Sequence, residues 1–307
     1  MANEAGTSGI EALARAEAEA SQIIDLGVRR LGGPPHPTRA PLVGDIRYHL
    51  AFPSKHLENE RTLIVYLPPG YRGSLAHHYP VLYMQDGQNL FDPSTSFQSV
   101  SWEANDTAER LILTRRIRPL IIVGIYNTPE RIAEYTVHVD DKLQGGKGRQ
   151  YGQFLFEEVK PFIDKTYRTK PDRRHTAVAG ASLGGKLTLA LAREHHDKFA
   201  LCGALSPSLW WARGKLLKEF EGGPRWMRRM RFWVDMGTKE GVSKTEIPQA
   251  ILRTRKLIQQ FDAAGLLPGH HYYYWEVTGG EHSEAHWAAR FDKFLLYFFG
   301  RRKGKRG

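Results

Sequence analysis

A serine set among glycines, in the stretch 180–185 (Gly-Ala-Ser-Leu-Gly-Gly), has the surroundings of a catalytic nucleophile. The apolar residues 175–181 predict a short strand, and residues 186–194 predict a helix. A sharp turn from strand to helix lifts a serine hydroxyl off the edge of a sheet, and such a turn tolerates only small neighbours. The helix also directs its free N–H groups and the positive end of its dipole at Ser182. This context favours a nucleophile over an incidental serine in a glycine-rich turn.

A serine hydroxyl is a poor nucleophile unless an oriented base removes its proton. His282 is the candidate base, because two glycines connect it to the last predicted strand and the final predicted helix follows it. Glu240 is the candidate acid that orients this histidine, since it lies in the loop after the predicted strand Arg231–Asp235. Asp235 is the alternative, but its direction depends on the register of the strand. We therefore predict Ser182, Glu240 and His282 as a catalytic triad.

Hydrolysis of an acyl group also needs two preorganised N–H groups to stabilise the developing oxyanion. Leu183, directly after the nucleophile, is expected to supply one of them. The other is expected from the loop 85–89 (Gln-Asp-Gly-Gln-Asn), which follows an early buried strand and in which Gly87 permits close approach of the backbone. Asp86, in the same loop, is a candidate substrate contact. The alternative interpretation of this loop is an ordinary Asp-Gly turn.

Three tryptophans lie in loops that are expected to face the same edge of the sheet: Trp102, Trp210 and Trp211. Aromatic walls suit aromatic acyl groups, sugars or catecholates. Arg131 and the general positive charge favour anionic substrates. The alternative for each tryptophan is packing in a lid or in the core.

Strands that alternate with helices, from about residue 45 onward, predict the scaffold for these residues. Residues 45–52 and 61–67 have the pattern of two antiparallel strands, whereas 80–84 and 120–125 are apolar runs typical of strands buried on both faces. Repeated β-α units imply a mostly parallel central sheet with helices on both faces, and the α/β-hydrolase fold fits best. We predict a helical extension and linker (1–40), a catalytic domain (41–300) and a basic tail (301–307).

The composition excludes several other classes of protein. The 307-residue chain carries a net charge of +11, but the charge is scattered, which argues against specific binding of nucleic acid as a function. No bilayer-spanning stretch, metal-binding cluster or nucleotide-binding loop is present in the sequence, so no membrane partner and no cofactor are predicted. Cys202, the one cysteine, lies in an apolar run and is predicted to be a buried thiol.

The N-terminal residues bear on where the protein is located and on whether it forms a dimer. The first residues lack the basic and apolar regions of a signal peptide, which indicates a cytoplasmic protein unless a signal has been trimmed. The predicted helix at residues 10–30 has three alternative roles, which are packing on the body, forming a homodimer and remaining mobile.

These stretches together resemble the "Putative esterase" family of α/β-hydrolases, which includes esterase D, enterochelin esterases, feruloyl esterases and mycolyltransferases. The resemblance implies that Ser182 is the nucleophile, Glu240 the acid and His282 the base, and that Gln88 and Leu183 supply the oxyanion N–H groups. The matching segments occur in the family's order and are Tyr66–Tyr71, Pro80–Asp92, Gly180–Gly185, Leu205–Trp211, Gly237-Thr238, and Gly279-Gly280 before His282.

Three functions are compatible with the sequence. The first is a serine carboxylesterase that acts through an acyl-enzyme on a small-molecule ester with an aromatic, sugar or catecholate part. The second is an acyltransferase that uses the same triad and passes the acyl group to an alcohol. The third is a non-catalytic binding protein, against which the intact set of serine, acid and histidine argues.

Overall fold

The computed structural model describes residues 42–73, 75–241 and 246–301. The predicted N-terminal helix at 10–30 and most of the predicted basic tail lie outside the described residues. Within the described ranges, every helix is too short or too polar to cross a membrane.

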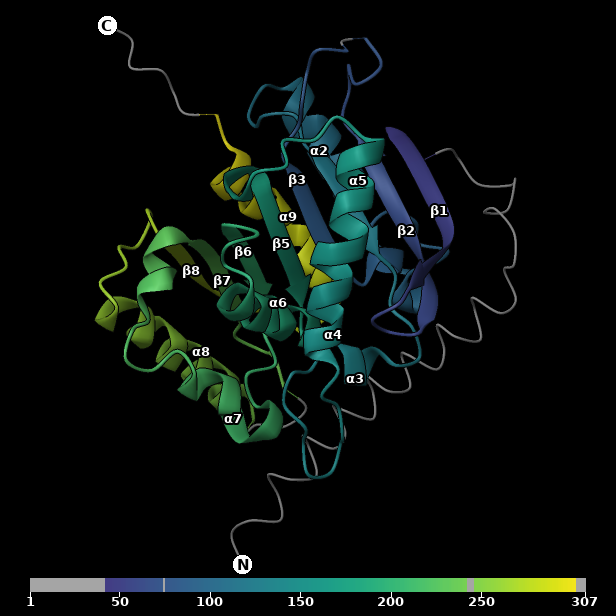
Figure 1. Ribbon diagram of the computed structural model, residues 1–307. Helices are drawn as coiled ribbons and strands as arrows, with labels where there is room; N and C mark the ends of the chain where they lie inside the picture. The colour runs from purple at the N-terminus through teal and green to yellow at the C-terminus, as the bar shows by residue number, and fades with distance from the viewer. Residues whose placement is uncertain (1–41, 74, 242–245, 302–307) are drawn as a thin grey trace, which may run out of the picture.

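The centre of the fold is an eight-stranded sheet in the order β1-β2-β4-β3-β5-β6-β7-β8 (Figure 1). β1 pairs antiparallel with β2, and β2 pairs antiparallel with β4, whereas all the other neighbours are parallel. The predicted mostly parallel sheet with antiparallel N-terminal strands is therefore confirmed. The strands are β1 (Asp45–Ser54), β2 (Asn59–Leu67), β3 (Val81–Gln85), β4 (Ile121–Ile125), β5 (Thr176–Ala181), β6 (Leu201–Leu205), β7 (Arg231–Gly237) and β8 (Tyr272–Val277).

Helices cover both faces of this sheet. The main helices are α2 (Ala104–Leu113), α3 (Arg131–Glu134), α4 (Gly148–Gln153), α5 (Lys160–Thr166), α6 (Leu183–Glu194), α7 (Trp211–Lys218), α8 (Glu246–Ala263) and α9 (Glu284–Phe299). The shorter segments are η1 (Gly87–Asn89), η2 (Phe97–Ser99), η3 (Phe154–Val159), η4 (Arg173–His175) and η5 (Arg225–Arg229). In Figure 1, α4, α5 and α6 lie in front of the sheet, and α9 lies behind it.

Two hydrophobic cores follow from the alternation of side chains along the strands. In β2, Leu63 and Val65 point into the core beneath α4 to α8, and Ile64 and Tyr66 point into the core beneath α2 and α9. The residues of β3, β4, β5 and β6 are all buried, as expected of strands covered on both faces. Cys202 is buried in β6.

The helix that crosses the front of the sheet continues through Pro161. It extends from Gly148 to Thr166, and a π-helical stretch, η3, lies between α4 and α5. Proline cannot donate a backbone hydrogen bond, and the helix changes from π to α geometry just before Pro161. The chain therefore accommodates the proline inside one continuous helix.

Candidate active site

Ser182, Glu240 and His282 follow the carboxyl ends of β5, β7 and β8. These strands belong to one parallel part of the sheet, with β6 between β5 and β7. The loops after them therefore emerge at the same edge. This arrangement brings together three side chains that are 58 and 42 residues apart in the sequence.

The backbone of Ser182 is strained at the turn between β5 and α6. Its φ of 57° and ψ of −124° place a serine in a region that side chains rarely adopt, at a cost of about 1–3 kcal/mol. Close packing holds this turn. A Cβ atom on Gly180 would lie 2.4 Å from Oε1 of Gln85 and 2.8 Å from the backbone of Gly184, so only glycine fits there. The strained turn presents the hydroxyl at the edge of the sheet.

A continuous chain of hydrogen bonds connects the three side chains. Oγ of Ser182 lies 2.8 Å from Nε2 of His282, and Nδ1 of His282 lies 2.8 Å from Oε2 of Glu240. An ionised carboxylate can only accept, so Nδ1–H donates to Glu240 and Nε2 is left to accept the serine proton. Ser182 and Glu240 are almost completely buried, whereas the side chain of His282 is 23% exposed.

The second oxygen of the Glu240 carboxylate is held by the neighbouring loops. Oε1 accepts a hydrogen bond of 2.6 Å from Oγ of Ser206 and another of 2.7 Å from the backbone N–H of Gly237. Burial works against ionisation, but the hydrogen bonds from His282 and Ser206 and the charge of Arg290 hold the pKa of Glu240 below its ordinary value. Glu240 therefore faces His282 as an oriented, ionised carboxylate.

Asp235, the alternative acid, lies inside β7 and faces a different set of partners. Its carboxylate accepts hydrogen bonds from Arg290 at 2.7 Å and from Nε1 of Trp233 at 2.6 Å. Burial raises the pKa of Asp235, although Arg290 and Trp233 act in the opposite direction. The register of β7 thus directs Asp235 at Arg290.

The loop 85–89 lies beside Ser182, because β3 and β5 are parallel neighbours. It forms the short helix η1, in which Gly87 packs so closely on β4 that an added Cβ atom would lie 2.4 Å from the backbone of Gly124. Oε1 of Gln88 accepts a 3.2 Å hydrogen bond from the backbone N–H of Asn127, which fixes this side chain. Leu183 is the first residue of α6, where backbone N–H groups have no partner within the helix.

Asp86 and Arg131, two predicted substrate contacts, are paired with each other. Nε and Nη2 of Arg131 donate to the two carboxylate oxygens of Asp86 at 2.8 and 2.9 Å. Asn127 donates to the same carboxylate at 2.7 Å, and the guanidinium group lies over the ring of Tyr135. Much of the positive charge of Arg131 is therefore neutralised, and the pair connects the loop after β3 to α3.

Two of the three predicted aromatic contacts are packed inside the protein. Trp102 is 4% exposed and lies against Trp287 and Phe291, and Trp287 in turn contacts the ring of His282. Trp211 is 1% exposed and donates to the backbone oxygen of His138. These two side chains have little surface left for a ligand, because they fill space beneath the loops. Trp210 is partly exposed.

Four further residues at this edge were not predicted from the sequence. Ser206 and Arg290 hold the acid, as described above. Ser208 places its Oγ 3.2 Å from that of Ser182. Glu284, in the first turn of α9, accepts a hydrogen bond from Asn89 at 3.1 Å, and burial and the nearby Asp86 carboxylate raise its pKa to about 7.

Three of these four residues had signals in the sequence, but the signals were not specific. Ser206 and Ser208 lie in the family-like stretch Leu205–Trp211, and Glu284 follows His282 by two residues. Arg290 gives no signal, because a cation in the middle of a predicted helix is ordinarily solvated. In the part of the chain that the structure describes, no group of three or more potential metal ligands occurs.

The sheet order, the turn at Ser182 and the buried acid define the class as the α/β-hydrolase fold, and solved structures agree. A ferulic acid esterase has a TM-score of 0.64 to this chain at 21% identity, over 84% of this chain and 99% of that one. Residues 54–298 match the family described as "Putative esterase". The protein therefore belongs to this family and is a carboxylic ester hydrolase.

Two proteins of Bacillus subtilis are among the relatives of this chain. The uncharacterized protein YbbA of Bacillus subtilis is 25% identical over 217 residues, which are 67% of this chain and 80% of YbbA. The ferri-bacillibactin esterase BesA of Bacillus subtilis is 28% identical over 158 residues, which are 46% of this chain. This chain spans about half, 52%, of the length of that esterase.

Proposed function

We propose that this protein is a serine carboxylesterase in which Ser182 is the nucleophile, His282 the base and Glu240 the orienting acid. One observation carries the proposal, namely the unbroken hydrogen-bond chain from Oγ of Ser182 through His282 to the buried Glu240. A serine with such partners can attack a carbonyl carbon at neutral pH.

Each atom of the chain has one task in this mechanism. Nε2 of His282 takes the proton of Ser182 as Oγ attacks the ester carbonyl, and Glu240 stabilises the imidazolium that results. The backbone N–H groups of Gln88 and Leu183 receive the developing oxyanion. His282 then gives its proton to the departing alcohol, which leaves an acyl-enzyme. A water molecule, activated by the same histidine, releases the acid.

The substrate class is proposed from the relatives and from Trp210, the one partly exposed indole among the three tryptophans that were predicted to face the site. Relatives and neighbours include a ferri-bacillibactin esterase and a ferulic acid esterase, so esters with a catecholate or other aromatic part are the first candidates. Trp210, partly exposed next to the buried Trp211, offers a flat surface for such a ring. Sugar esters are the second candidates.

A panel of esters tests the proposal directly. p-Nitrophenyl, feruloyl and catechol-siderophore esters are incubated with the protein, with and without an added acceptor alcohol, and the products are separated by chromatography. We expect free acid as the main product and loss of turnover in Ser182→Ala. Ser208→Ala is the matched control, because the Ser208 hydroxyl lies 3.2 Å from that of Ser182 but lacks its hydrogen bond to His282. Transfer of the acyl group to the alcohol in preference to water would identify an acyltransferase instead.

The proposal is wrong if the folded wild-type protein hydrolyses none of these esters.

A further inference from the structure

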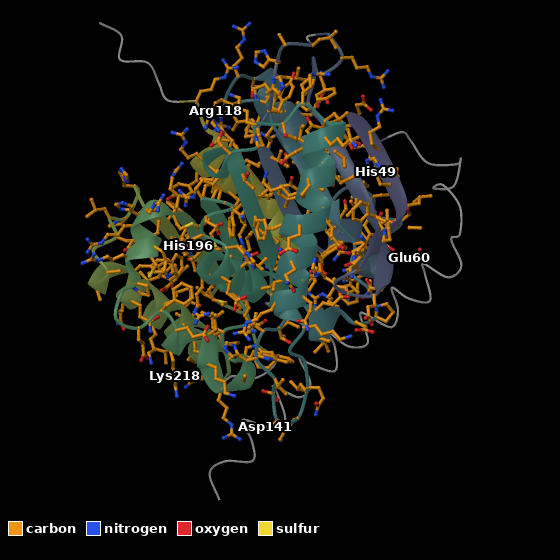
Figure 2. The ribbon with its side chains drawn as sticks, viewed as in Figure 1. His49, Glu60, Arg118, Asp141, His196 and Lys218 are labelled. Carbon is orange, nitrogen blue, oxygen red and sulfur yellow. The ribbon has the colours of Figure 1, made fainter. Side chains whose placement is uncertain are left out.

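A cavity of about 800 Å³ opens at the edge of the sheet opposite to Ser182. Arg118 precedes β4, Arg231 is the first residue of β7 and His270 precedes β8, so these residues mark the amino ends of parallel strands. Figure 2 shows Arg118 at one end of the molecule, with Asp141 and Lys218 at the other. The residues that line the cavity are Arg118, Arg231, Gly269, His270, Leu296, Tyr297, Phe298, Gly300 and Arg301.

Positive charge without a counter-charge distinguishes this cavity. Three arginines and a histidine line it, and no carboxylate is among the lining residues. Across the described ranges, none of the three guanidinium groups lies within ion-pair distance of an aspartate or glutamate. Like charges gathered around one space repel each other, and a bound anion would offset that cost.

The guanidinium groups of Arg231 and Arg301 are held in place by the surrounding backbone, and Arg118 is held through its main chain. Arg231 lies over the ring of Tyr297, with its guanidinium carbon 4.4 Å from the ring centre, and donates to the backbone oxygen of Tyr297 at 2.8 Å. Arg301 donates from Nε to the backbone oxygen of Ile117, and the backbone N–H of Arg118 bonds the oxygen of Phe299. A preordered guanidinium group loses less conformational entropy when it binds a ligand.

A structural role accounts for only part of this arrangement. The carboxyl end of α9 carries partial negative charge, and cations stabilise such an end. Arg231 does this through the oxygen of Tyr297. The side chain of Arg118, however, makes no hydrogen bond to a described residue, and Arg301 bonds a loop carbonyl and no carbonyl of α9. Capping of α9 therefore does not require all three arginines.

We propose that this cavity is a binding site for a small phosphorylated molecule. The planar fork of arginine matches the spacing of phosphate oxygens, and several arginines around one phosphate bind it through charge-assisted hydrogen bonds. Leu296, Tyr297 and Phe298 provide an apolar wall for an organic part of the ligand. The volume falls in the range of small-molecule sites, and a concave cavity fits a compact ligand better than a nucleic-acid helix. The proposal does not depend on the esterase mechanism.

Calorimetry with the full-length chain tests this site. Inorganic pyrophosphate and adenosine diphosphate are titrated at constant ionic strength, with sodium chloride as the reference. We expect saturable binding of at least one of the two probes and an increase in Tm that saturates at the same concentration. Arg231→Gln and Arg118→Gln should each weaken binding about tenfold, because each removes a charge-assisted hydrogen bond.

Arg213→Gln is the matched control, since Arg213 is exposed at the other end of the molecule, where it pairs with Asp141. It removes the same charge and should leave binding unchanged. Arg118→Gln decides the matter if Arg231→Gln does not fold. The proposal is wrong if the wild-type protein shows no saturable binding of either probe, or if Arg213→Gln weakens binding as much as Arg118→Gln. Binding of duplex DNA that pyrophosphate does not displace would also overturn it, because the arginines would then form an open basic surface.

Discussion

The carboxylate of Asp235 accepts a 2.7 Å hydrogen bond from the guanidinium group of Arg290, and both side chains are completely buried. The same nitrogen of Arg290 lies 2.6 Å from Oγ of Ser206 and 3.5 Å from Glu240. The guanidinium group of Arg290 thus contacts the carboxylates of both Asp235 and Glu240, which face in different directions. Asp235 faces the interior, and Glu240 faces His282. This division leads to opposite predictions for the two carboxylates.

Glu240→Gln should lower kcat by about three to four orders of magnitude, in line with loss of the triad acid in other serine hydrolases. The amide keeps the shape of the side chain but loses the charge that stabilises the imidazolium. Steady-state kinetics on an ester substrate measure the effect, and circular dichroism checks that the fold is intact. Near wild-type activity in this variant would remove Glu240 from the mechanism.

Asp235→Asn should affect stability more than chemistry. The change leaves the buried charge of Arg290 without its closest partner, and breaking a buried ion pair costs about 3–5 kcal/mol. Thermal unfolding should show a markedly lower Tm, whereas kcat of the folded protein should stay within about tenfold of wild type. A variant that is folded and almost inactive would reverse the roles of the two acids.

Ser182 should be the residue that a fluorophosphonate probe modifies. Its hydroxyl is hydrogen-bonded to Nε2 of His282, whereas the hydroxyl of Ser208 has no such bond to a histidine among the described residues. Mass spectrometry of the labelled wild-type protein should locate the adduct on Ser182, and Ser182→Ala should abolish labelling while Ser208→Ala keeps it. An adduct on another residue of an active enzyme would contradict the assignment.

Glu284 should make the binding of anionic substrates depend on pH. Burial and the Asp86 carboxylate raise the pKa of Glu284 to about 7, although His282 and Arg131 favour its ionised form. Above pH 7 it therefore adds a negative charge beside the site. For an ester with a carboxylate in its acyl part, KM should increase about fivefold more from pH 6 to pH 8 in the wild type than in Glu284→Gln. A neutral ester is the control, and equal pH profiles of KM in the two proteins would exclude this role.

Ionisation of Glu284 should also make the stability of the fold depend on pH. A carboxyl whose pKa is raised in the folded state stabilises the fold below its unfolded pKa, and this contribution is lost as the pH rises through about 7. Glu284→Gln should therefore lose less stability than the wild type between pH 5 and pH 8.

Replacement of the buried Lys186 by an apolar residue should stabilise the protein. It lies one turn after Ser182, is 1% exposed, and its Nζ has no hydrogen-bond partner. Burial lowers the pKa of Lys186 to about 7, so the folded state resists protonation that the unfolded chain accepts. Lys186→Met should raise the free energy of unfolding, and the gain should be about 1 kcal/mol larger at pH 6 than at pH 8. Urea unfolding at both pH values measures this, and a gain independent of pH would show that the amine is not the cause.

The scaffold was predictable because its signals are local. Apolar runs, glycines and the alternation of strand and helix gave the sheet, and a parallel sheet gathers the residues after its strands at one edge. Ser182, Glu240 and His282 each occupy such a position, so their proximity could be predicted from the sequence alone. Their catalytic roles remain predictions. The family-like segments added the order of these positions along the chain.

The contacts made across the sheet were not predictable. Trp102 and Trp211 occupy loop positions in the sequence, but whether an indole lines a site or fills the core depends on what covers it. Arg290 reaches β7 and Ser206 from the middle of α9, a contact between segments more than 50 residues apart. Such pairings follow from the packing of one layer on another, which no local pattern encodes.

The strained backbone of Ser182 also bears on the evolution of this chain. Glycine adopts a positive φ without penalty, so a lineage under selection for folding alone would gain stability by exchanging this serine for glycine. A descendant that keeps serine at position 182 retains this conformational cost, and the proposed role of its hydroxyl as the nucleophile accounts for keeping it. A descendant with glycine there would have a less strained turn and would lack the hydroxyl that the proposed mechanism requires.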